Sequence, residues 1–460
     1  MMRCLYAGVA GLQNHQVRMD VIGNNVSNVN TYGYKKNRVS FQDLLYQNMS
    51  GAAAPTVEVG GINPKQVGLG MSIAQIGTIF TQGALQTTGR NLDLAITGEG
   101  FFILKKGENV FYSRSGVFGI DKDGVLVNPA NGFRVQGWNA EFVDGKYVIN
   151  TANPIGEIQI PVGGKSPAKA TTKIDYKSNL NSETPPLPVG REPTADEVAA
   201  SVHKTTIDIY DSKGNKHQLQ LSFTRVPGTV NQWTCQATLL DLPNVNIQLD
   251  VPGANINDSN NINLLFNNEG AIIGVQDSPN EPGAPIDLSN VGNLIANATF
   301  TLPDGQQQQI TLNLGTSGQY DGITQFASPT TTKAVDQDGY GMGYLETFVI
   351  DNQGVITGIY SNGEKLPLGQ IALATFTNPE GLQKVGDNNF AQTINSGTAN
   401  ISAANTAGKG ALVAGALEMS NVDLSEEFTD MIVTQRGFEA NSKTIQTADQ
   451  MLQVIMGLKR

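Results

Sequence analysis

The chain ends in the stretch LEMSNVDLSEEFTDMIVTQRGFEANSKTIQTADQML, residues 417–452, in which apolar side chains recur every seven residues. The recurring residues are Leu417, Leu424, Met431, Phe438, Ile445 and Leu452. A seven-residue repeat forms one apolar row along an α-helix and suits packing against a second helix. Ser420 and Asp423 supply a start signal, and Gly457 supplies a stop. We therefore predict one long helix from Ser420 to Met456.

The start of the chain carries a matching repeat, formed by Leu5, Leu12, Met19 and Val26. Residues 1–50 hold five basic and two acidic side chains, a net charge of +3, whereas residues 411–460 hold seven acidic and four basic ones, a net charge of −3. Opposite charges and matching apolar rows predict that the two helices pair as a coiled coil. Two interpretations stay open. The pair is either a hairpin that closes a monomer or a surface that further copies of the chain cover.

After the first helix comes NNVSNVNTYGYKK, residues 24–36, with four asparagines in its first seven positions. Asparagine disfavours helix interiors but suits caps, turns and left-handed backbone. The stretch therefore predicts the end of the helix, followed by an ordered connector held by hydrogen bonds. The residues expected to form this connector are Asn24, Asn25, Asn28, Asn30 and Gly33.

The middle of the chain predicts β structure. The whole chain has 51 glycines in 460 residues, and only 15% of its residues are charged. This composition is typical of turn-rich β proteins. Alternating apolar and polar residues flank four predicted hairpin turns, at Asp121–Gly124, Ser212–Asn215, Asn352–Gly354 and Ser361–Gly363. Small residues over 396–416 predict an extended, flexible connector before the C-terminal helix.

Composition argues against several classes of protein. A net charge of −11 disfavours nucleic acid as a partner. No run of 18 apolar residues predicts a membrane span, and the first twenty residues lack the apolar core of a cleaved signal peptide. Cys4 and Cys235 are too few for a disulfide framework or a multi-cysteine metal site. The three histidines lack metal-ligand neighbours at helical spacing, so we expect no metal, no cofactor and no catalytic residue.

Several blocks, in the right order, resemble the axial proteins of the bacterial flagellum, the rod and hook family. They are MDVIGNNVSNVNTYGYKK (19–36), TTGRNLDLAITGEGFFIL (87–104), YSRSGVFGIDKDGVLVNPANGFRVQGW (112–138), NPEGLQKVGDNNFAQTINSG (378–397) and the C-terminal stretch from Leu417. Residues of about 150–335 match this family only in character. Distal rod subunits look similar but lack a large central insertion, so the length favours the hook and leaves the distal rod as the alternative.

The resemblance implies a multidomain, mainly β fold with an α-helical terminal domain, in which β domains are nested between paired terminal helices. The implied segments are a helical core at 1–30 and 411–460, connectors at 31–90 and 396–410, an inner β domain at 91–150 and 336–395, and one or more outer β domains at 151–335.

The resemblance further implies a structural subunit, not an enzyme, that self-assembles into the curved, hollow hook. The hook transmits torque from the motor and rod to the filament as a universal joint. The implied partners are further copies of the chain, the distal rod, the hook cap, the hook–filament junction proteins and the flagellar type III export apparatus. The implied location is the hook and basal body, outside the cytoplasm, and the periplasm if the source is a spirochaete. The connector asparagines would hold the chain against neighbouring subunits.

The start MMR and the stretch GGKSPAKATTKIDYKSNLN, residues 163–181, resemble spirochaetal hook proteins. In those proteins a cysteine loses sulfide to give dehydroalanine, and a lysine amine of the neighbouring subunit adds to it. Here the matching position holds Ser178, and Lys165 would be the nucleophile. Hydroxide leaves much less readily than sulfide, so the sequence leaves open whether a Lys165–Ser178 link forms.

Two further classes stay open from the sequence. The central β region alone is compatible with a surface adhesin or glycan-binding protein, although that class does not explain the two heptad-bearing ends. An enzyme such as a glycoside hydrolase would need a pair of carboxylates that converge in a cleft.

Overall fold

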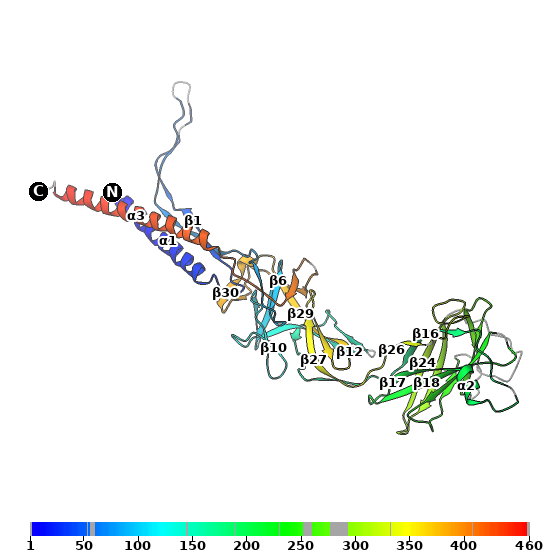
Figure 1. Cartoon of the computed structure of the whole chain (residues 1–460). Helices are drawn as coiled ribbons and strands as arrows, with labels where there is room; N and C mark the ends of the chain where they lie inside the picture. Colours follow the sequence, from blue (N-terminus) through cyan, green and yellow to red (C-terminus); the bar gives the residue numbers. More distant parts are fainter. Residues whose placement is uncertain are drawn as a thin grey trace. The chain divides into compact units, whose positions relative to one another are not determined.

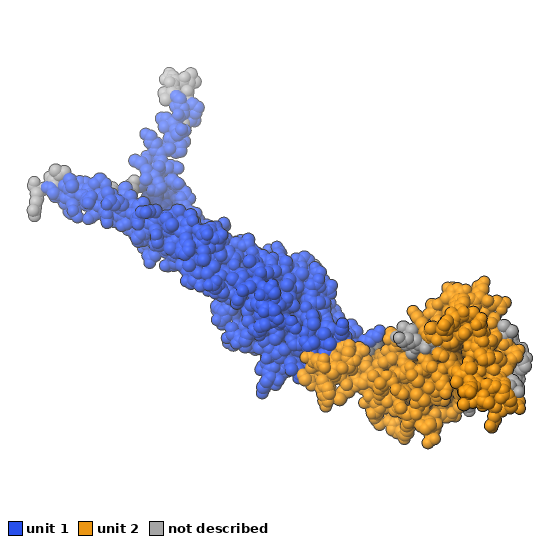
Figure 2. Space-filling model, viewed as in Figure 1, with its two compact units in different colours: residues 1–162, 347–359, 365–460 blue, residues 163–346, 360–364 orange. Residues whose placement is uncertain are grey.

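The computed structural model describes residues 2–52, 54–55, 60–143, 146–188, 190–229, 231–251, 260–276, 293–331, 333–406 and 408–457. The chain divides into two compact units (Figure 2). Unit 1 comprises residues 1–162, 347–359 and 365–460, and unit 2 comprises residues 163–346 and 360–364. Both ends of the chain therefore belong to unit 1, and unit 2 is an insertion in it.

Unit 1 contains the two long helices and most of the short strands (Figure 1). Its N-terminal elements are α1 (Met2–Ser27), β1 (Asn37–Asp43), β2 (Tyr46–Ser50), β3 (Lys65–Gly68), β4 (Met71–Thr78), β5 (Leu85–Thr87), β6 (Leu94–Thr97), β7 (Phe101–Lys106), β8 (Asn109–Ser113), β9 (Gly119–Ile120), β10 (Leu126–Val127), β11 (Arg134–Asn139), β12 (Glu141–Val143), β13 (Lys146–Val148) and β14 (Gly156–Glu157). Its C-terminal elements are β28 (Val355–Tyr360), β29 (Lys365–Thr375), the 3-10 turn η1 (Pro379–Gly381), β30 (Gln383–Gly386), β31 (Asn389–Ala391), β32 (Asn400–Ala403), β33 (Ala411–Ala414), β34 (Ala416–Glu418) and α3 (Leu424–Gly457).

The main sheet of unit 1 joins strands from both ends of the sequence. Its central path runs β27–β28–β29–β11–β7–β8–β31–β30, where β27 (Gly343–Ile350) begins in unit 2. Alternating strand residues bury an aromatic core beneath it, because successive side chains of a strand point to opposite faces. Phe80, Phe101 and Phe390 are in mutual ring contact there. Residues about 290 positions apart in the sequence therefore build this core together.

Unit 2 is a two-sheet β structure with one shared core. Its elements are β15 (Lys165–Ser166), β16 (Lys173–Asn181), α2 (Ala195–Ser201), β17 (Val202–Tyr210), β18 (Lys216–Arg225), β19 (Gln232–Leu239), β20 (Gln248–Asp250), β21 (Asn261–Phe266), β22 (Ile272–Gln276), β23 (Asn293–Thr301), β24 (Gln307–Thr316), β25 (Ile323–Phe326) and β26 (Lys333–Gln337). One sheet has the order β17–β18–β19–β21–β22, and the other β20–β23–β24–β16–β25 with β26 beside β16. Buried side chains of both sheets, such as Trp233 and Tyr176, belong to one hydrophobic cluster. The described part of the insertion is thus one domain.

The four predicted hairpin turns are confirmed. Each closes with a glycine whose φ is positive, namely Gly124, Gly214, Gly354 and Gly363. The amide of each glycine donates to the carbonyl three residues earlier, at 2.9–3.1 Å. Glycine is favoured at these positions because side-chain-bearing residues adopt positive φ only with strain.

The two terminal helices lie side by side and run antiparallel (Figure 1). Gly8 near the start of α1 is opposite Ile445 near the end of α3, whereas Asn25 near the end of α1 bonds Glu427 near the start of α3. The N-cap of α3 is Asp423, whose Oδ1 accepts from the amides of Ser425 and Glu426. The predicted start at Ser420 is therefore four residues early.

The predicted boundaries differ from the structure at both ends of the C-terminal connector. Residues 411–418, which the resemblance assigned to the helical core domain, form β33 and β34, which pair with β6 and β5. Residues 400–403, expected in a flexible connector, form β32 and pair with β29. This segment is extended, as predicted, but it pairs with a sheet strand instead of linking domains freely, and small residues such as Ala404 are buried within unit 1. Small side chains suit close packing as well as flexibility.

Candidate functional site

The two predicted rows of apolar residues lie on α1 and α3, but to the side of the line along which the two helices touch. Leu5, Leu12, Met19, Val26, Met431, Phe438, Ile445 and Leu452 are half-buried, and Leu424 is exposed. On α3 the buried residues are Glu427, Thr434 and Ala448. On α1 they are Gly8, Gly11, Ile22 and Asn25. Within one chain, a small and polar row thus forms the seam, and the larger apolar side chains flank it.

Glycines set the close approach of the two helices. A Cβ on Gly8 would lie 2.9 Å from Cγ1 of Ile445, and one on Gly11 would lie 2.6 Å from Nδ2 of Asn441. A Cβ on Gly437 of α3 would lie 2.8 Å from the His15 ring. The seam is extended by an ion pair of 2.9 Å between Arg18 and Asp430. Sequence reasoning missed this seam because glycine and asparagine do not count as apolar.

Much apolar surface of this region is uncovered in the single chain. On α3 the exposed fraction is 40–69% for Leu424, Phe428, Ile432, Val433, Met451, Val454, Ile455 and Met456. A two-stranded ribbon of β2 and β3 extends from the β1–β4 pair (Figure 1). It also exposes large apolar side chains, among them Leu45, Tyr46 and Met49. Such contiguous apolar surface marks sites of protein association.

The asparagine-rich stretch ends α1 at Ser27, as predicted. Asn28 donates from its side chain to the Asn24 carbonyl at 2.9 Å, so it satisfies a carbonyl of the last turn. Asn24 accepts from the Tyr34 hydroxyl at 2.8 Å. Asn30 is exposed. Two of these side chains thus cap the helix and hold the chain as it turns back.

Asn25 is the buried centre of the connector. Its amide donates to the carbonyl of Asn37 at 2.8 Å and to Oε2 of Glu427 at 3.2 Å. Its Oδ1 accepts from the amide of Asn37 at 3.0 Å and from the Tyr34 hydroxyl at 3.2 Å. Burial raises the pKa of Glu427, and the bond from Asn25 opposes that shift. One side chain therefore ties the end of α1 to the connector and to α3.

Gly33 supplies the sharpest backbone constraint of the connector. Its φ is +71°, and an added Cβ would lie 2.6 Å from the backbone nitrogen of Ser115. Its amide donates to the carbonyl of Glu418 at 2.8 Å. Only glycine combines this conformation with this approach, so the connector is fastened to the unit 1 sheet.

Next to Gly33 lies a buried ionic cluster that sequence reasoning missed. Lys35 and Glu418 form an ion pair of 2.6 Å, and both side chains are 0% exposed. Arg114 is 3.4 Å from the other oxygen of Glu418. Burial lowers the pKa of Lys35 although Glu418 opposes that shift. One signal was present in the sequence, since Glu418 is the only charged residue between Gly410 and Val422.

Lys384 of β30 also contacts the connector. Its ammonium donates to the Lys35 carbonyl at 2.8 Å and to Oδ1 of Asn37 at 2.9 Å, and lies 4.8 Å from the centre of the Tyr34 ring. Although Lys384 as a residue is exposed, its ammonium is enclosed by these groups, and burial lowers its pKa to about 8.

The two residues of the possible covalent link both lie in unit 2. Lys165 is an exposed residue of β15, and its ammonium lies 5.7 Å from the centre of the Tyr344 ring. Ser178 lies in β16, and its Oγ is buried with no hydrogen-bond partner among the described residues. A nucleophile therefore has no direct access to this side chain in the described conformation.

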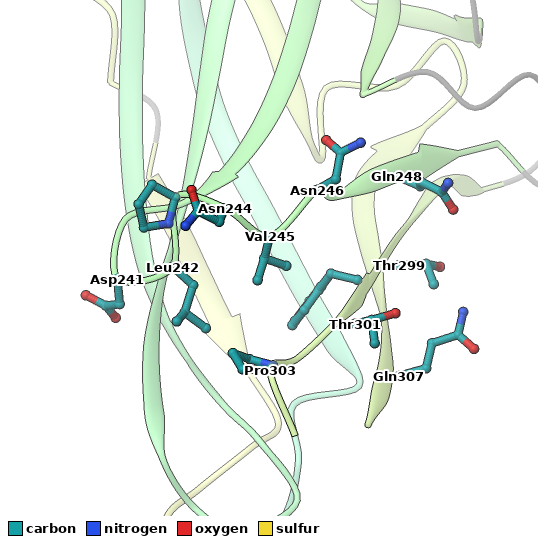
Figure 3. Close-up of a pocket in the computed structure, with 12 residues that line it drawn as sticks. Asp241, Leu242, Asn244, Val245, Asn246, Gln248, Thr299, Thr301, Pro303 and Gln307 are labelled. Carbon is teal, nitrogen blue, oxygen red and sulfur yellow. The ribbon is translucent and has the colours of Figure 1, made fainter. Parts of the chain in front are cut away.

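A pocket of about 790 Å³ in unit 2 bears on the glycan-binding and hydrolase alternatives (Figure 3). Amide side chains of Asn246, Gln248 and Gln307 gather at one end, and Leu242 and Pro303 lie toward the other. Among the twelve lining residues the only carboxylate is Asp241. This pocket therefore lacks the pair of carboxylates that glycoside hydrolysis requires.

The described residues show neither a metal site nor a membrane span. Within those ranges, no group of three or more His, Cys, Asp or Glu side chains could hold a metal ion. No helix in the described part of the chain is both long and apolar enough to span a membrane.

Profiles of flagellar protein families match four segments of the chain. The flagella basal body rod protein profile matches residues 5–35, and the flagellar hook protein FlgE/F/G D1 domain profile matches residues 95–175. The flagellar basal body protein FlaE D2 domain profile matches residues 179–340, and the flagellar basal body rod FlgEFG C-terminal profile matches residues 413–458. The D2 match corrects the expectation that the central region resembles the family only in character.

Full-length relatives and one solved structure agree with these profiles. The crystal structure of Helicobacter pylori flagellar hook protein FlgE2 covers 73% of this chain and 100% of its own, with a TM-score of 0.51 and 16% identity, a likeness of fold alone. The flagellar hook protein FlgE of Treponema pallidum is 50% identical over 100% of both chains. That of Borreliella burgdorferi is 49% identical, again over 100% of both chains. The chain therefore belongs to the flagellar hook protein FlgE family.

Proposed function

We propose that this chain is the structural subunit of the bacterial flagellar hook. Copies of it self-assemble into a curved, hollow tube that acts as a universal joint between the rod and the filament. Relatives of about half identity over their full length carry the name flagellar hook protein, which supports this assignment. The terminal profiles are shared with rod proteins, so the distal rod is the second candidate, and the large unit 2 favours the hook.

One observation carries the proposal: the single chain leaves its terminal helices and the β2–β3 ribbon largely uncovered. Of the 34 residues of α3, only Glu427, Thr434 and Ala448 are buried. A helix in a finished globular protein buries a continuous apolar stripe. Copies of the same chain supply the missing cover, and a contact that does not close on itself generates a helical tube.

The half-buried rows beside the seam are the surfaces we assign to contacts between copies. In this proposal the seam holds α1 and α3 of one chain together, and the flanking rows face neighbouring helices in the core of the tube. The assigned residues are Leu5, Leu12, Met19, Val26, Leu424, Met431, Phe438, Ile445 and Leu452.

The mechanical role follows from this assembly. A curved tube that turns on its own axis requires each subunit to shorten and lengthen along the tube once per turn, which joints between rigid parts permit. Its ends would meet the distal rod, the hook cap and the hook–filament junction proteins, and its subunits would leave the cytoplasm by the flagellar type III export apparatus. The function proposed here is structural, and no catalytic step is assigned to any residue.

Electron microscopy of the full chain under polymerising conditions tests the proposal. The wild-type chain should form hollow tubes, curved for a hook and straight for a rod, whereas an adhesin or an enzyme should form none. Ile432→Asp places a charge on the exposed apolar face of α3 and should abolish tubes while leaving thermal unfolding of unit 2 unchanged. Gln435→Asp adds the same charge at an exposed polar position of α3 and is the matched control, expected to assemble.

Each outcome has a defined meaning. Absence of tubes from the wild-type chain contradicts self-assembly. Normal tubes from Ile432→Asp would show that the exposed face of α3 is not a contact between copies.

A further inference from the structure

Glu418, the last residue of β34, collects hydrogen bonds from three separate segments of unit 1. Its Oε1 accepts from the Lys35 ammonium at 2.6 Å and from the Gly83 amide at 3.0 Å. Its Oε2 accepts from Arg114 Nη1 at 3.4 Å, and its backbone carbonyl accepts from the Gly33 amide at 2.8 Å. The segment after α1, the segment before β5 and the segment after β8 therefore all converge on one residue, six positions before α3 begins.

The donors around Glu418 are themselves held in place. Arg114 also donates to the carbonyls of Ile96 at 3.3 Å and Gly98 at 2.6 Å, and its guanidinium carbon lies 5.6 Å from the centre of the Phe101 ring. Lys35 also donates to the carbonyl of Thr81 at 2.8 Å. Arg114 is thus fastened to β6, to the residue after it and to the first residue of β7, and Lys35 is part of the connector that leaves α1.

Asn421, three residues nearer to α3 in the sequence, makes a second linkage of the same kind. Asn421 accepts from the amide of Lys36 at 2.7 Å and donates to the carbonyl of Ile79 at 2.9 Å. Lys384 of the sheet donates to the carbonyl of Lys35. The chains that enter and leave the helix pair are therefore joined to each other and to the sheet through polar groups of fixed direction.

Stability alone does not explain why charges occupy this place. Two cations and one carboxylate are buried here, and removing them from water is costly. Apolar side chains of similar volume often stabilise a buried site equally well, but they pack in more than one arrangement. The Glu418 carboxylate has three donors, two charged side chains and the Gly83 amide, and their directions are all satisfied in one arrangement only. The cluster thus selects one orientation of the helix pair relative to the sheet.

We propose that Glu418 is a positioning residue that locks the α1–α3 pair to the sheet of unit 1, so that the two move as one body when the hook bends. The inference rests on the proposed function and deepens it. It excludes the junction at residues 33–37, 79–85 and 418–421 from the joints that take up bending.

Three variants of the full chain test the lock. Glu418→Gln keeps the shape and removes the charge that Lys35 and Arg114 neutralise. The triple variant Lys35→Met/Arg114→Met/Glu418→Leu removes all three charges together. Glu426→Gln is the control, because Glu426 also pairs with a lysine of the connector, Lys36 at 2.6 Å, but its side chain is 62% exposed.

The first readout is the angle between α3 and β29 in individual subunits of curved tubes, measured by electron cryomicroscopy. In the wild type this angle should vary less around the tube than the angle between unit 1 and unit 2. In Glu418→Gln and in the triple variant its spread should rise about twofold or more, as expected when a rigid coupling becomes a hinge. Glu426→Gln should match the wild type. An unchanged spread in the triple variant would overturn the inference, because apolar packing would then fix the angle.

The second readout needs no tubes and separates this inference from the proposed function. Hydrogen exchange of the unassembled full chain reports on the amides of Gly33 and Gly83, which donate to Glu418. Both should be protected in the wild type and in Glu426→Gln and should lose protection in Glu418→Gln. Equal protection in Glu418→Gln would overturn the lock. A wild-type chain that is protected here but forms no tubes would contradict self-assembly and leave the lock standing.

Discussion

Gly33 concentrates two constraints in one residue, a positive φ and a backbone contact with Ser115. Gly33→Ala should lower the free energy of unfolding of unit 1 by more than the cost of left-handed backbone alone, about 1–2 kcal/mol. Gly89→Ala is the matched control, since Gly89 has a similar φ of +73° but open space around its Cβ position. Thermal unfolding of the full chain measures both. Equal losses in the two variants would contradict a steric role for Gly33.

Ser178 disfavours a covalent link between subunits. Its hydroxyl is a poor leaving group, and its Oγ is buried, so we expect no Lys165–Ser178 linked peptide in wild-type tubes. Mass spectrometry of denatured tubes measures this directly. Ser178→Cys restores the sulfur on which elimination depends in the proteins that the stretch resembles, and it serves as the positive control. A linked peptide from the wild type would contradict the expectation.

Residues whose role depends on their own local chemistry could be predicted from the sequence. Residues whose role depends on partners far away in the sequence could not. The asparagines around the end of α1 were expected to form a connector because Asn favours caps and turns, and Asn25 lies at its buried centre. Glu418 gave only a weak signal, because its partners Lys35 and Arg114 lie 383 and 304 positions away in the sequence. Only the topology of unit 1 brings these three charges together.

At the scale of elements, the distance between α1 and α3 depends on glycine. Gly11→Leu would place a side chain where Asn441 now lies, and overpacking of this kind costs about 1–3 kcal/mol. Gly23→Leu is the control on the same helix, because nothing lies within 4 Å of its Cβ position and leaving glycine favours the helix by up to about 1 kcal/mol. We expect tube formation to fail for Gly11→Leu and to persist for Gly23→Leu. Equal tube yields, counted by electron microscopy, would show that the seam tolerates separation.

The seven-residue period of the two helices could be predicted, but the faces through which they contact each other could not. The repeat of seven among Leu12, Met19, Met431 and Phe438 identified both helices. The seam itself repeats with the same period, one position away on α1, through residues that apolar patterns ignore, such as Gly11 and Thr434. Apolar periodicity reports the side chains that need cover, whether their partner is in the same chain or in another one.

Asp338, the residue after β26, is hydrogen-bonded to the start of β16 in unit 2. It accepts from the amides of Thr172 at 2.8 Å and Lys173 at 2.9 Å, from the Thr172 hydroxyl at 2.6 Å and from the Lys169 ammonium at 3.0 Å. Burial alone would raise the pKa of Asp338, but these donors lower it to about 2. A carboxylate with a lowered pKa stabilises the fold above its unfolded pKa of 3.8, and this contribution is lost as the pH falls from there to about 2.

Asp338→Asn should therefore destabilise unit 2 at neutral pH by about 1 kcal/mol, at the low end for charged hydrogen bonds because the side chain is partly exposed. The difference from the wild type should shrink as the pH falls below 3.8 and vanish near 2. Urea unfolding of the full chain over this range measures it, with Asp123→Asn, an exposed turn aspartate of unit 1, as the control. A difference that stays constant with pH would contradict the role of the charge.

At the scale of the whole molecule, the two units differ in how complete they are alone. The described part of unit 2 buries a continuous core that includes Trp233, Phe223 and Leu312. The sheet of unit 1 likewise has its own core. The helix pair has no comparable core, since three of the 34 residues of α3 are buried and two of those are Glu427 and Thr434. Cover from other molecules is thus needed by the helix pair, which the two ends of the sequence form, and not by unit 2, which the middle of the sequence forms.

This difference predicts where order depends on assembly. Fixing the backbone of a residue costs about 1–2 kcal/mol, and a helix pair that buries so little cannot offset that cost over its whole length. In the unassembled chain, amides of α1 and α3 should exchange within seconds, while those of β7, β11 and β29 stay protected. In tubes all of them should be protected, because neighbouring copies then cover residues such as Phe428 and Ile432. Hydrogen exchange of both states measures this, and slow exchange of α3 in the monomer would mean that the pair is a finished hairpin and that its apolar face serves another purpose.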